Sequence, residues 1–141
     1  MLISILFGWA CPAAASTHIY FVTTERHAWA TSLAVCQANG GSLAKIGTAG
    51  ESELARQAIA QNPNFDPWEG LWIGLYRERE ESNIFRWLSD SSLFIEGTGW
   101  FDPTARPYTN WHQYEPNNVC GTENCVAADR SGWYVVRATL L

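Results

Sequence analysis

The spacing of hydrophobic positions changes several times along the chain, and each change marks a different expected element. Residues 18–23 are aromatic and β-branched, which predicts a first strand. Residues 71–76 form a nearly continuous apolar run, which is typical of a central buried strand. Residues 85–88 alternate between apolar and polar side chains and predict a second strand of this kind. A further strand is expected at residues 125–128.

A helical period follows the first strand, over residues 27–38. Its apolar positions are separated by four and three residues and therefore share one helix face: Trp29, Leu33 and Cys36. Thr24 is available as the N-cap, and Asn39-Gly40-Gly41 tolerates the positive φ at which helices end. We therefore expect one amphipathic helix before residue 39.

A second helix is expected from Thr48 to about Gln61, after a brief extended segment at residues 42–46. Thr48 and Glu51 have the spacing of a capping box, and Pro63 ends the helix. The residues available for its buried side are Ala49, Leu54, Ala58 and Ile59.

The hydrophobic residues show no regular spacing between Ser89 and about Gly121. This stretch is rich in Gly, Pro, Asn, Asp, Ser and Trp, and so long a loop inside a compact domain is usually functional or disordered. Three aromatic anchors argue against disorder: Trp100, Tyr108 and Trp111. We therefore expect an ordered, functional loop.

The N-terminal residues 1–16 have the pattern of a secretory signal peptide. Residues 2–10 are apolar over a length too short to cross a bilayer, and small residues follow as at a signal-peptidase site. A buried first strand is the alternative interpretation. Removal of the signal would leave residues 17–141 as one secreted domain with an odd number of cysteines: Cys36, Cys120 and Cys125. An odd number implies an unpaired thiol, an intermolecular bridge or a missing partner.

Composition narrows the class of protein. The 141 residues carry 14 acidic and 9 basic side chains, and this net charge of −5 argues against nucleic-acid partners and anionic membrane surfaces. Apolar residues make up 47% of the chain, which is enough for the core of a single domain. The low charged fraction of 16% and the eight Trp residues are typical of a small, loop-rich extracellular domain without a membrane span.

Oxygen-bearing side chains are concentrated at the end of the long loop, in residues 108–125. They are Asn110, Glu115, Asn117, Asn118 and Glu123. Calcium accepts six to eight oxygen ligands, so two glutamates and neighbouring amides on adjacent loop segments suit this ion. The alternative is a solvated polar loop whose Asn side chains only stabilise turns.

Two other kinds of chemistry find no support in the sequence. The spacing of His18, His27, His112 and the cysteines fits no short zinc motif. No G-x-S-x-G motif occurs, and no motif ties a Ser, a His and an acid into a triad. Glu115 and Glu123 could be considered as the two catalytic acids of a glycosidase. Both lie on a loop of a small chain, however, and the sequence indicates no substrate cleft for such a pair. We therefore expect a protein that is not an enzyme.

Several short motifs occur in a fixed order along the chain. They are Trp29 with Cys36 and residues 40–44, Glu51-Ser52-Glu53-Leu54, Trp72-Ile73-Gly74-Leu75, Phe85-Arg86-Trp87-Leu88-Ser89-Asp90, Tyr108-Thr109-Asn110-Trp111 and Glu115-Pro116-Asn117. Each motif alone is weak, but the ordered set resembles the C-type lectin-like domain over nearly the whole of residues 17–141. The resemblance implies an α+β fold in which two helices flank small antiparallel sheets, with a long calcium- and sugar-binding loop.

In this family a Glu-Pro-Asn triplet lies in the long loop, usually with a cis peptide bond before the proline. The resemblance implies that Glu115 and Asn117, with Glu123 as the third ligand residue, hold Ca²⁺ and bind two vicinal hydroxyls of a sugar. Glu-Pro-Asn, rather than Gln-Pro-Asp, is the version associated with mannose-, glucose- and fucose-type sugars.

The C-terminal segment departs from the family pattern. Sugar-binding members complete the calcium shell with a Trp-Asn-Asp triplet, whereas this chain has Trp133-Tyr134-Val135. Three of the usual five ligand residues remain, so we expect Tyr134 and Val135 to weaken calcium binding. The two further cysteines of the family, expected to pair with Cys125 and Cys36, and its last strand do not follow. The resemblance therefore implies a C-terminally truncated domain, with residues 134–141 foreign to the family.

Two functions are compatible with these observations. The first is Ca²⁺-dependent recognition of mannose-, glucose- or fucose-type sugars on a glycan or glycoprotein, through Glu115, Asn117 and Glu123. The second is calcium-independent binding of a protein or another surface ligand by the same fold. Single lectin domains bind each sugar weakly and gain avidity by clustering, so a clustered or disulfide-linked oligomer is compatible with either function. Cys120, which is extra to the family pattern, is able to bridge to another chain or to Cys125.

Overall fold

The computed structural model describes residues 2–7, 18–23, 25–62, 66, 70–80, 82–95 and 108–138. The strands are β1 (Leu2–Phe7), β2 (His18–Thr23), β3 (Gly41–Leu43), β4 (Leu71–Arg77), β5 (Ile84–Trp87), β6 (Leu93–Ile95), β7 (Cys125–Ala128) and β8 (Trp133–Val136). The helices are α1 (Trp29–Ala38), α2 (Ala49–Ala60) and the short 3₁₀ helix η1 (Val119–Gly121). The expected α+β class is confirmed, because two α-helices accompany one mainly antiparallel sheet.

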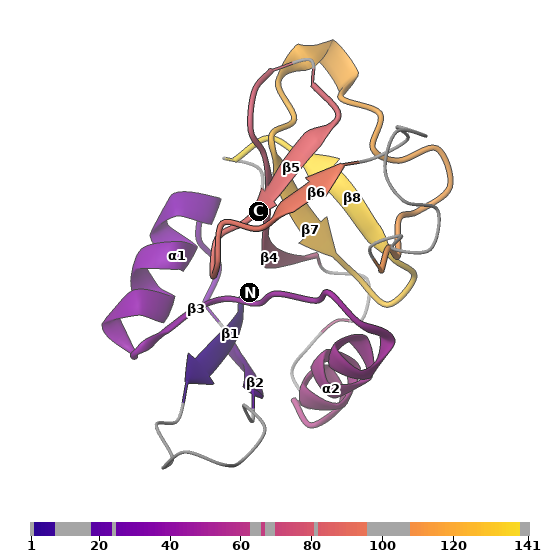
Figure 1. Ribbon diagram of the computed structural model, residues 1–141. Helices are drawn as coiled ribbons and strands as arrows, with labels where there is room; N and C mark the ends of the chain where they lie inside the picture. The colour runs from indigo at the N-terminus through magenta and orange to yellow at the C-terminus, as the bar shows by residue number, and fades with distance from the viewer. Residues whose placement is uncertain are drawn as a thin grey trace.

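Strand β4 is the centre of the sheet. The main strand order is β2-β1-β4-β5-β6, while β3 pairs with β1 and β7 pairs with both β4 and β8. All of these pairs are antiparallel except β1 with β4. Figure 1 shows α1 and α2 on opposite sides of the β1–β2 pair, with β5 to β8 gathered at the other end of the molecule.

Strand β1 lies in the segment that we expect to be a signal peptide. It pairs with β2 over the full length of both strands, from Leu2 opposite Thr23 to Phe7 opposite His18. This placement is the one anticipated by the alternative interpretation as a first strand. A strand in the uncleaved chain does not test removal during secretion, so the signal peptide and the 17–141 domain stay predictions. No helix in the described part of the chain is long and apolar enough to cross a membrane.

The first helix differs from its expected start. Helix α1 begins at Trp29 with Ala28 as its N-cap, and no side chain caps it. The expectation that Thr24 is the N-cap is therefore wrong; Thr24 itself lies outside the described residues. The expected stop is confirmed, because Asn39 is the C-cap and Gly40 has a φ of 76°.

The second helix begins as expected but buries another face. The Thr48 side chain accepts a hydrogen bond from the Glu51 backbone N–H at 3.1 Å, so the N-cap is confirmed. The expected buried side is wrong in part, because Ala55 is the buried residue of the helix and Leu54 is 46% exposed. Ala49 is also exposed, whereas Ala58 and Ile59 are partly buried against the core, as expected. Pro63 lies outside the described residues.

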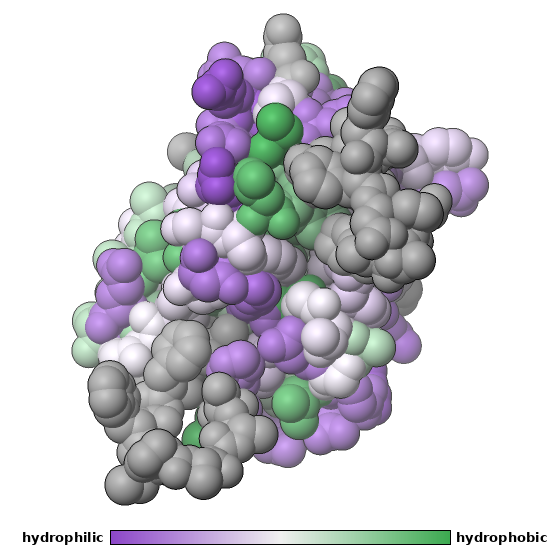
Figure 2. All heavy atoms as spheres, in the orientation of Figure 1, coloured by the Kyte–Doolittle hydropathy of each residue, from purple (hydrophilic) through white to green (hydrophobic). Residues whose placement is uncertain are grey.

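The apolar run of β4 is buried on both faces, as its sequence predicts. Leu71, Trp72, Ile73 and Leu75 are fully buried. Gly74 donates its N–H to the Ala44 carbonyl at 2.8 Å, and a Cβ at Gly74 would lie 2.7 Å from the Leu43 carbonyl oxygen. A glycine is therefore required where β4 passes the chain after β3. In Figure 2, hydrophobic residues on the visible face form small separate groups between hydrophilic ones.

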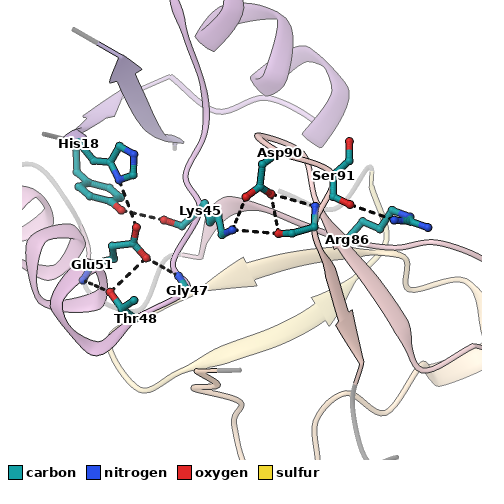
Figure 3. A network of polar contacts seen from close by, with 10 residues as sticks. His18, Lys45, Gly47, Thr48, Glu51, Arg86, Asp90 and Ser91 are labelled. Carbon is teal, nitrogen blue, oxygen red and sulfur yellow. Dashed lines mark hydrogen bonds and ion pairs between the residues drawn. The ribbon is translucent and has the colours of Figure 1, made fainter. Parts of the chain in front are cut away.

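A polar network joins the start of α2 to the turn after β5 (Figure 3). Lys45 Nζ lies 2.6 Å from Asp90 Oδ2 and donates to the Ser92 hydroxyl at 3.0 Å. Partial burial acts to raise the pKa of Asp90, but hydrogen bonds from Lys45 and Ser92 outweigh it and lower that pKa to about 2. On the α2 side, Glu51 accepts from the Gly47 backbone N–H and lies 3.3 Å from His18.

The described part of the long irregular stretch includes a strand that the sequence pattern does not reveal, β6. Its Phe94 is buried and packs edge-on against Phe85. Tyr108 and Trp111 pack against the core, as expected of aromatic anchors, while Trp100 lies outside the described residues. The described end of the loop is therefore fixed to the sheet by aromatic contacts.

Candidate functional site

The site is built on the end of the long loop, whose base is tied to β8. Trp111 forms a bridge with Trp133, and the flanking backbone contacts are His112 N–H to the Trp133 carbonyl at 2.8 Å and Trp133 N–H to the Asn110 carbonyl at 2.6 Å. Trp133 is 1% exposed and packs edge-on against the rings of Trp111 and Trp87. The buried indole thus anchors the loop before its oxygen-rich part begins.

A histidine–aspartate pair lies beside this base. His112 Nε2 lies 2.9 Å from Asp129 Oδ1, and the same oxygen accepts hydrogen bonds from Ser131. Burial acts to raise the pKa of Asp129, but the contacts with Ser131 and His112 outweigh it and lower that pKa. The His112 ring is edge-on to Tyr134, with 5.6 Å between ring centroids. His112 is thus engaged in the loop base, although its side chain stays partly exposed.

Glu115 and Asn117 face each other across Pro116. The Glu115–Pro116 peptide bond is cis, as the resemblance implies. Asn117 Nδ2 donates to Glu115 Oε1, and the Asn117 backbone N–H is 3.4 Å from Glu115 Oε2. The carboxylate and the amide therefore form one contiguous polar surface.

Glu123 joins this pair through the backbone of Val119. The Val119 N–H is 2.8 Å from Glu123 Oε2 and 3.2 Å from Asn117 Oδ1. One donor therefore holds oxygens of both side chains, and the three candidate ligands Glu115, Asn117 and Glu123 lie together. We call these three residues the oxygen cluster.

The other two oxygen-bearing residues of the loop do not join the oxygen cluster. Asn118 Oδ1 accepts the Glu123 backbone N–H at 3.1 Å, so its side chain stabilises the turn. Asn110 contributes its backbone carbonyl to the loop base. The interpretation as a turn-stabilising polar loop is thus correct for Asn118.

Strand β8 reaches the oxygen cluster with its backbone. Glu115 Oε2 accepts the Val135 N–H at 2.9 Å, while the Val135 side chain is 3% exposed and packs in the core. Tyr134 is partly buried, and burial together with the charge of Asp129 raises its pKa to about 12. The two residues in the place of Asn-Asp therefore supply an N–H donor and a neutral phenol instead of carboxylate and amide ligands.

Arg77 is a charged neighbour of the oxygen cluster that the sequence analysis missed. Its side chain is at the end of β4 and the residue is 4% exposed. Arg77 Nε donates to the Glu123 carbonyl at 3.2 Å, and the Arg77 backbone N–H donates to the Asn124 carbonyl at 2.8 Å. A single arginine after an apolar run carries no spacing signal, which is why the pattern did not reveal it.

The oxygen cluster fits a calcium ion in part. Two carboxylates and one amide converge, and these are the hard oxygen donors that calcium prefers. Among the described residues, no group of three or more His, Cys, Asp or Glu side chains is placed to hold a metal ion. A bound ion would therefore take three side-chain ligands here and the rest of its shell from water, backbone or ligand hydroxyls, which corresponds to weak binding.

The two cysteines nearest the loop differ in accessibility. Cys120 is exposed in η1, and Cys125 is buried at the start of β7, where burial raises the pKa of its thiol to about 12. Both are free thiols, so no bridge joins Cys120 to Cys125.

Comparison with known proteins identifies the sequence family. The model of the lectin C-type domain matches residues 25–139, which includes part of the segment that we expected to be foreign to the family. Human C-type mannose receptor 2 is 34% identical over 110 residues, covering 77% of this chain. The chain spans only 6% of the length of that receptor. A perlucin-like protein of Mytilus galloprovincialis is 30% identical over 118 residues, covering 82% of this chain and 65% of the relative.

Solved structures show the same fold. The C-type carbohydrate-recognition domain of cow CD23, studied in the presence of a GlcNAc2Man3 oligosaccharide, superposes with a TM-score of 0.61 at 26% identity, covering 92% of this chain and 89% of that domain. The lectin CEL-I of Cucumaria echinata superposes with a TM-score of 0.56 at 22% identity, covering 79% of this chain and 76% of the lectin.

Proposed function

The chain belongs to the C-type lectin domain family, a non-enzymatic family, and from this premise we propose that it is a glycan-binding module that uses Ca²⁺. The proposed ligand is a pair of vicinal hydroxyls on a mannose-, glucose- or fucose-type sugar. The observation that carries the proposal is the linkage of three side chains: the Val119 N–H holds oxygens of Asn117 and Glu123, and the Asn117 amide donates to Glu115. The relative from cow, whose structure was studied with a mannose-containing oligosaccharide, supports the same ligand class.

The residues of the oxygen cluster have complementary roles toward a sugar. The Glu115 carboxylate accepts a hydrogen bond from one hydroxyl, and the Asn117 amide donates to the lone pair of the other. The Val135 N–H and the Asn117 amide hold the Glu115 carboxylate in a fixed orientation before the sugar arrives. A bound calcium ion would supply positive charge to the hydroxyl oxygens. No covalent bond is made or broken.

Calcium-independent binding of a protein or another surface ligand is the second candidate function. Two observations favour it: Val135 directs an N–H, rather than a carboxylate oxygen, at Glu115, and Tyr134 adds no amide oxygen. Apolar side chains also flank the oxygen cluster, since Tyr114 is 84% exposed and Val119 is 56% exposed. Such side chains suit the apolar surface of a protein partner.

The double substitution Glu115→Gln with Asn117→Asp tests the proposed function. It reverses the order of acceptor and donor around the hydroxyl pair, so preference on a glycan array should move from mannose-type toward galactose-type sugars. The matched control is Glu53→Gln with Asn83→Asp, which makes the same chemical changes at exposed positions on other elements. An unchanged array profile in the first variant would favour the calcium-independent function.

We also propose that the domain is secreted and acts on glycans or glycoproteins outside the cell. The family is typically extracellular, and the N-terminal segment has the pattern of a signal peptide. The exposed Cys120 thiol is placed to link two copies, which would raise avidity for clustered sugars.

A further inference from the structure

The Arg77 side chain, at the end of β4, places a positive charge beside the oxygen-rich end of the loop. The Arg77 guanidinium donates through Nε to the Glu123 carbonyl and through Nη1 to the Ser82 carbonyl, and its carbon lies 4.7 Å from the centroid of the Phe85 ring. Its Nη2 is buried without a hydrogen-bond partner among the described residues. The side chain is therefore held firmly, but its hydrogen bonds do not compensate its charge completely.

The negative charges of Glu115 and Glu123 act on Arg77. Burial lowers the pKa of Arg77, and the charges of Glu123 and Glu115 oppose that effect. A buried cation is costly unless anions lie near it. Conversely, two carboxylates that share one small site repel each other unless a cation lies near them. Each group thus reduces the electrostatic cost of the other.

We propose that Arg77 is the resident cation of the loop, holding the Glu115–Asn124 segment in its binding geometry when no metal is bound. In this role Arg77 is a positioning residue, since it contacts the carbonyl of Glu123 rather than the ligand. Its backbone N–H, bonded to the Asn124 carbonyl, and its Nε, bonded to the Glu123 carbonyl, fix the end of that segment to β4. The inference concerns the same residues as the proposed function and deepens it.

A resident cation has two consequences of opposite sign. It orders the loop without calcium, and its positive charge opposes the entry of a second cation beside the same carboxylates. Removal of the charge should therefore loosen the metal-free loop but strengthen calcium binding. An arginine with a merely structural role would weaken both properties when removed.

Hydrogen exchange and calcium titration test the proposal without any sugar. In the wild-type protein in EDTA, we expect amides of residues 119–124 to be protected. In Arg77→Gln this protection should fall in EDTA and return with calcium, and calcium affinity by calorimetry should rise on the order of tenfold. Arg77→Lys keeps the charge and should bind calcium as weakly as wild type. Arg86→Gln is the matched control. Like Arg77, Arg86 donates to a backbone carbonyl, that of Ser91, but its other partner is the Glu78 carboxylate, which lies outside the oxygen cluster.

Three results would overturn the proposal. They are free exchange of the wild-type loop in EDTA, unchanged protection in Arg77→Gln, and unchanged or weaker calcium binding in that variant. If Arg77→Gln does not fold, free exchange of the wild-type loop in EDTA still overturns the proposal, and so does calcium binding by Arg77→Lys that is clearly tighter than that of wild type. Because none of these measurements involves a glycan, a failure here is distinguishable from a failure of sugar binding.

Discussion

The Glu115 carboxylate accepts the backbone N–H of Val135 at 2.9 Å, and this contact joins the tip of the long loop to the last described strand. In the family pattern the Val135 position carries a carboxylate that completes the calcium shell. Here its side chain is turned into the core, and only its backbone faces Glu115. The loop is therefore held by the protein itself at a place where other members use a metal ligand.

Tyr134→Asn is expected to strengthen calcium binding by several-fold. The substitution adds an amide oxygen at the position where the family pattern has Asn, and calcium affinity depends on ligand number. Isothermal titration with CaCl2 measures the change. Tyr134→Phe adds no oxygen and serves as the control, so equal affinities in the two variants would show that position 134 does not reach the ion.

Gly132→Ala is expected to destabilise the loop base by about 2 kcal/mol or more. Gly132 has a φ of 155°, and a Cβ there would lie 2.6 Å from the Asn110 carbonyl oxygen, which also accepts the Trp133 N–H. Urea unfolding measures the loss. Gly50→Ala is the comparison, since a Cβ at Gly50 meets only the Thr48 hydroxyl at 3.9 Å. A Gly132→Ala protein as stable as wild type would contradict this account of the turn.

The Lys45–Asp90 pair is expected to contribute stability that disappears in acid. The folded pKa of Asp90 is lowered to about 2 from an ordinary value of 3.8, so the contribution is present above about pH 4 and is lost as the pH falls toward 2. Because the Asp90 side chain is 48% exposed, solvent screening limits the effect to about 0.5–1 kcal/mol. Asp90→Asn should unfold more easily than wild type at pH 7 and equally at pH 2. A difference that persists at pH 2 would contradict this assignment.

Elements with a strong local signal were predictable from the sequence. The apolar run of β4 and the Thr48 cap of α2 depend on neighbouring residues alone, and both are confirmed. The start of α1 was not predictable from capping residues, because Ala28 caps without a side chain and tertiary contacts, such as Trp29 N–H to the Ala138 carbonyl, fix that end. Leu54 was misplaced because an apolar residue on a helix does not reveal which face meets the core.

The composition of the site was predictable, but its assembly was not. Glu115, Asn117 and Glu123 stood out as oxygen donors in a loop that resembles a known pattern. Their convergence depends on the backbone N–H of Val119, which no side-chain pattern encodes. The approach of Arg77 depends on the pairing of β4 with β7, a contact between segments about 50 residues apart.

Retention of the purified protein on immobilised mannose, first with calcium and then with EDTA, tests the central claim most directly. The account predicts retention in calcium and elution by EDTA, with the Glu115→Gln, Asn117→Asp variant not retained. Passage of the folded wild-type protein through the column in calcium would contradict Ca²⁺-dependent recognition of mannose-type sugars. Retention that persists in EDTA would contradict the calcium dependence.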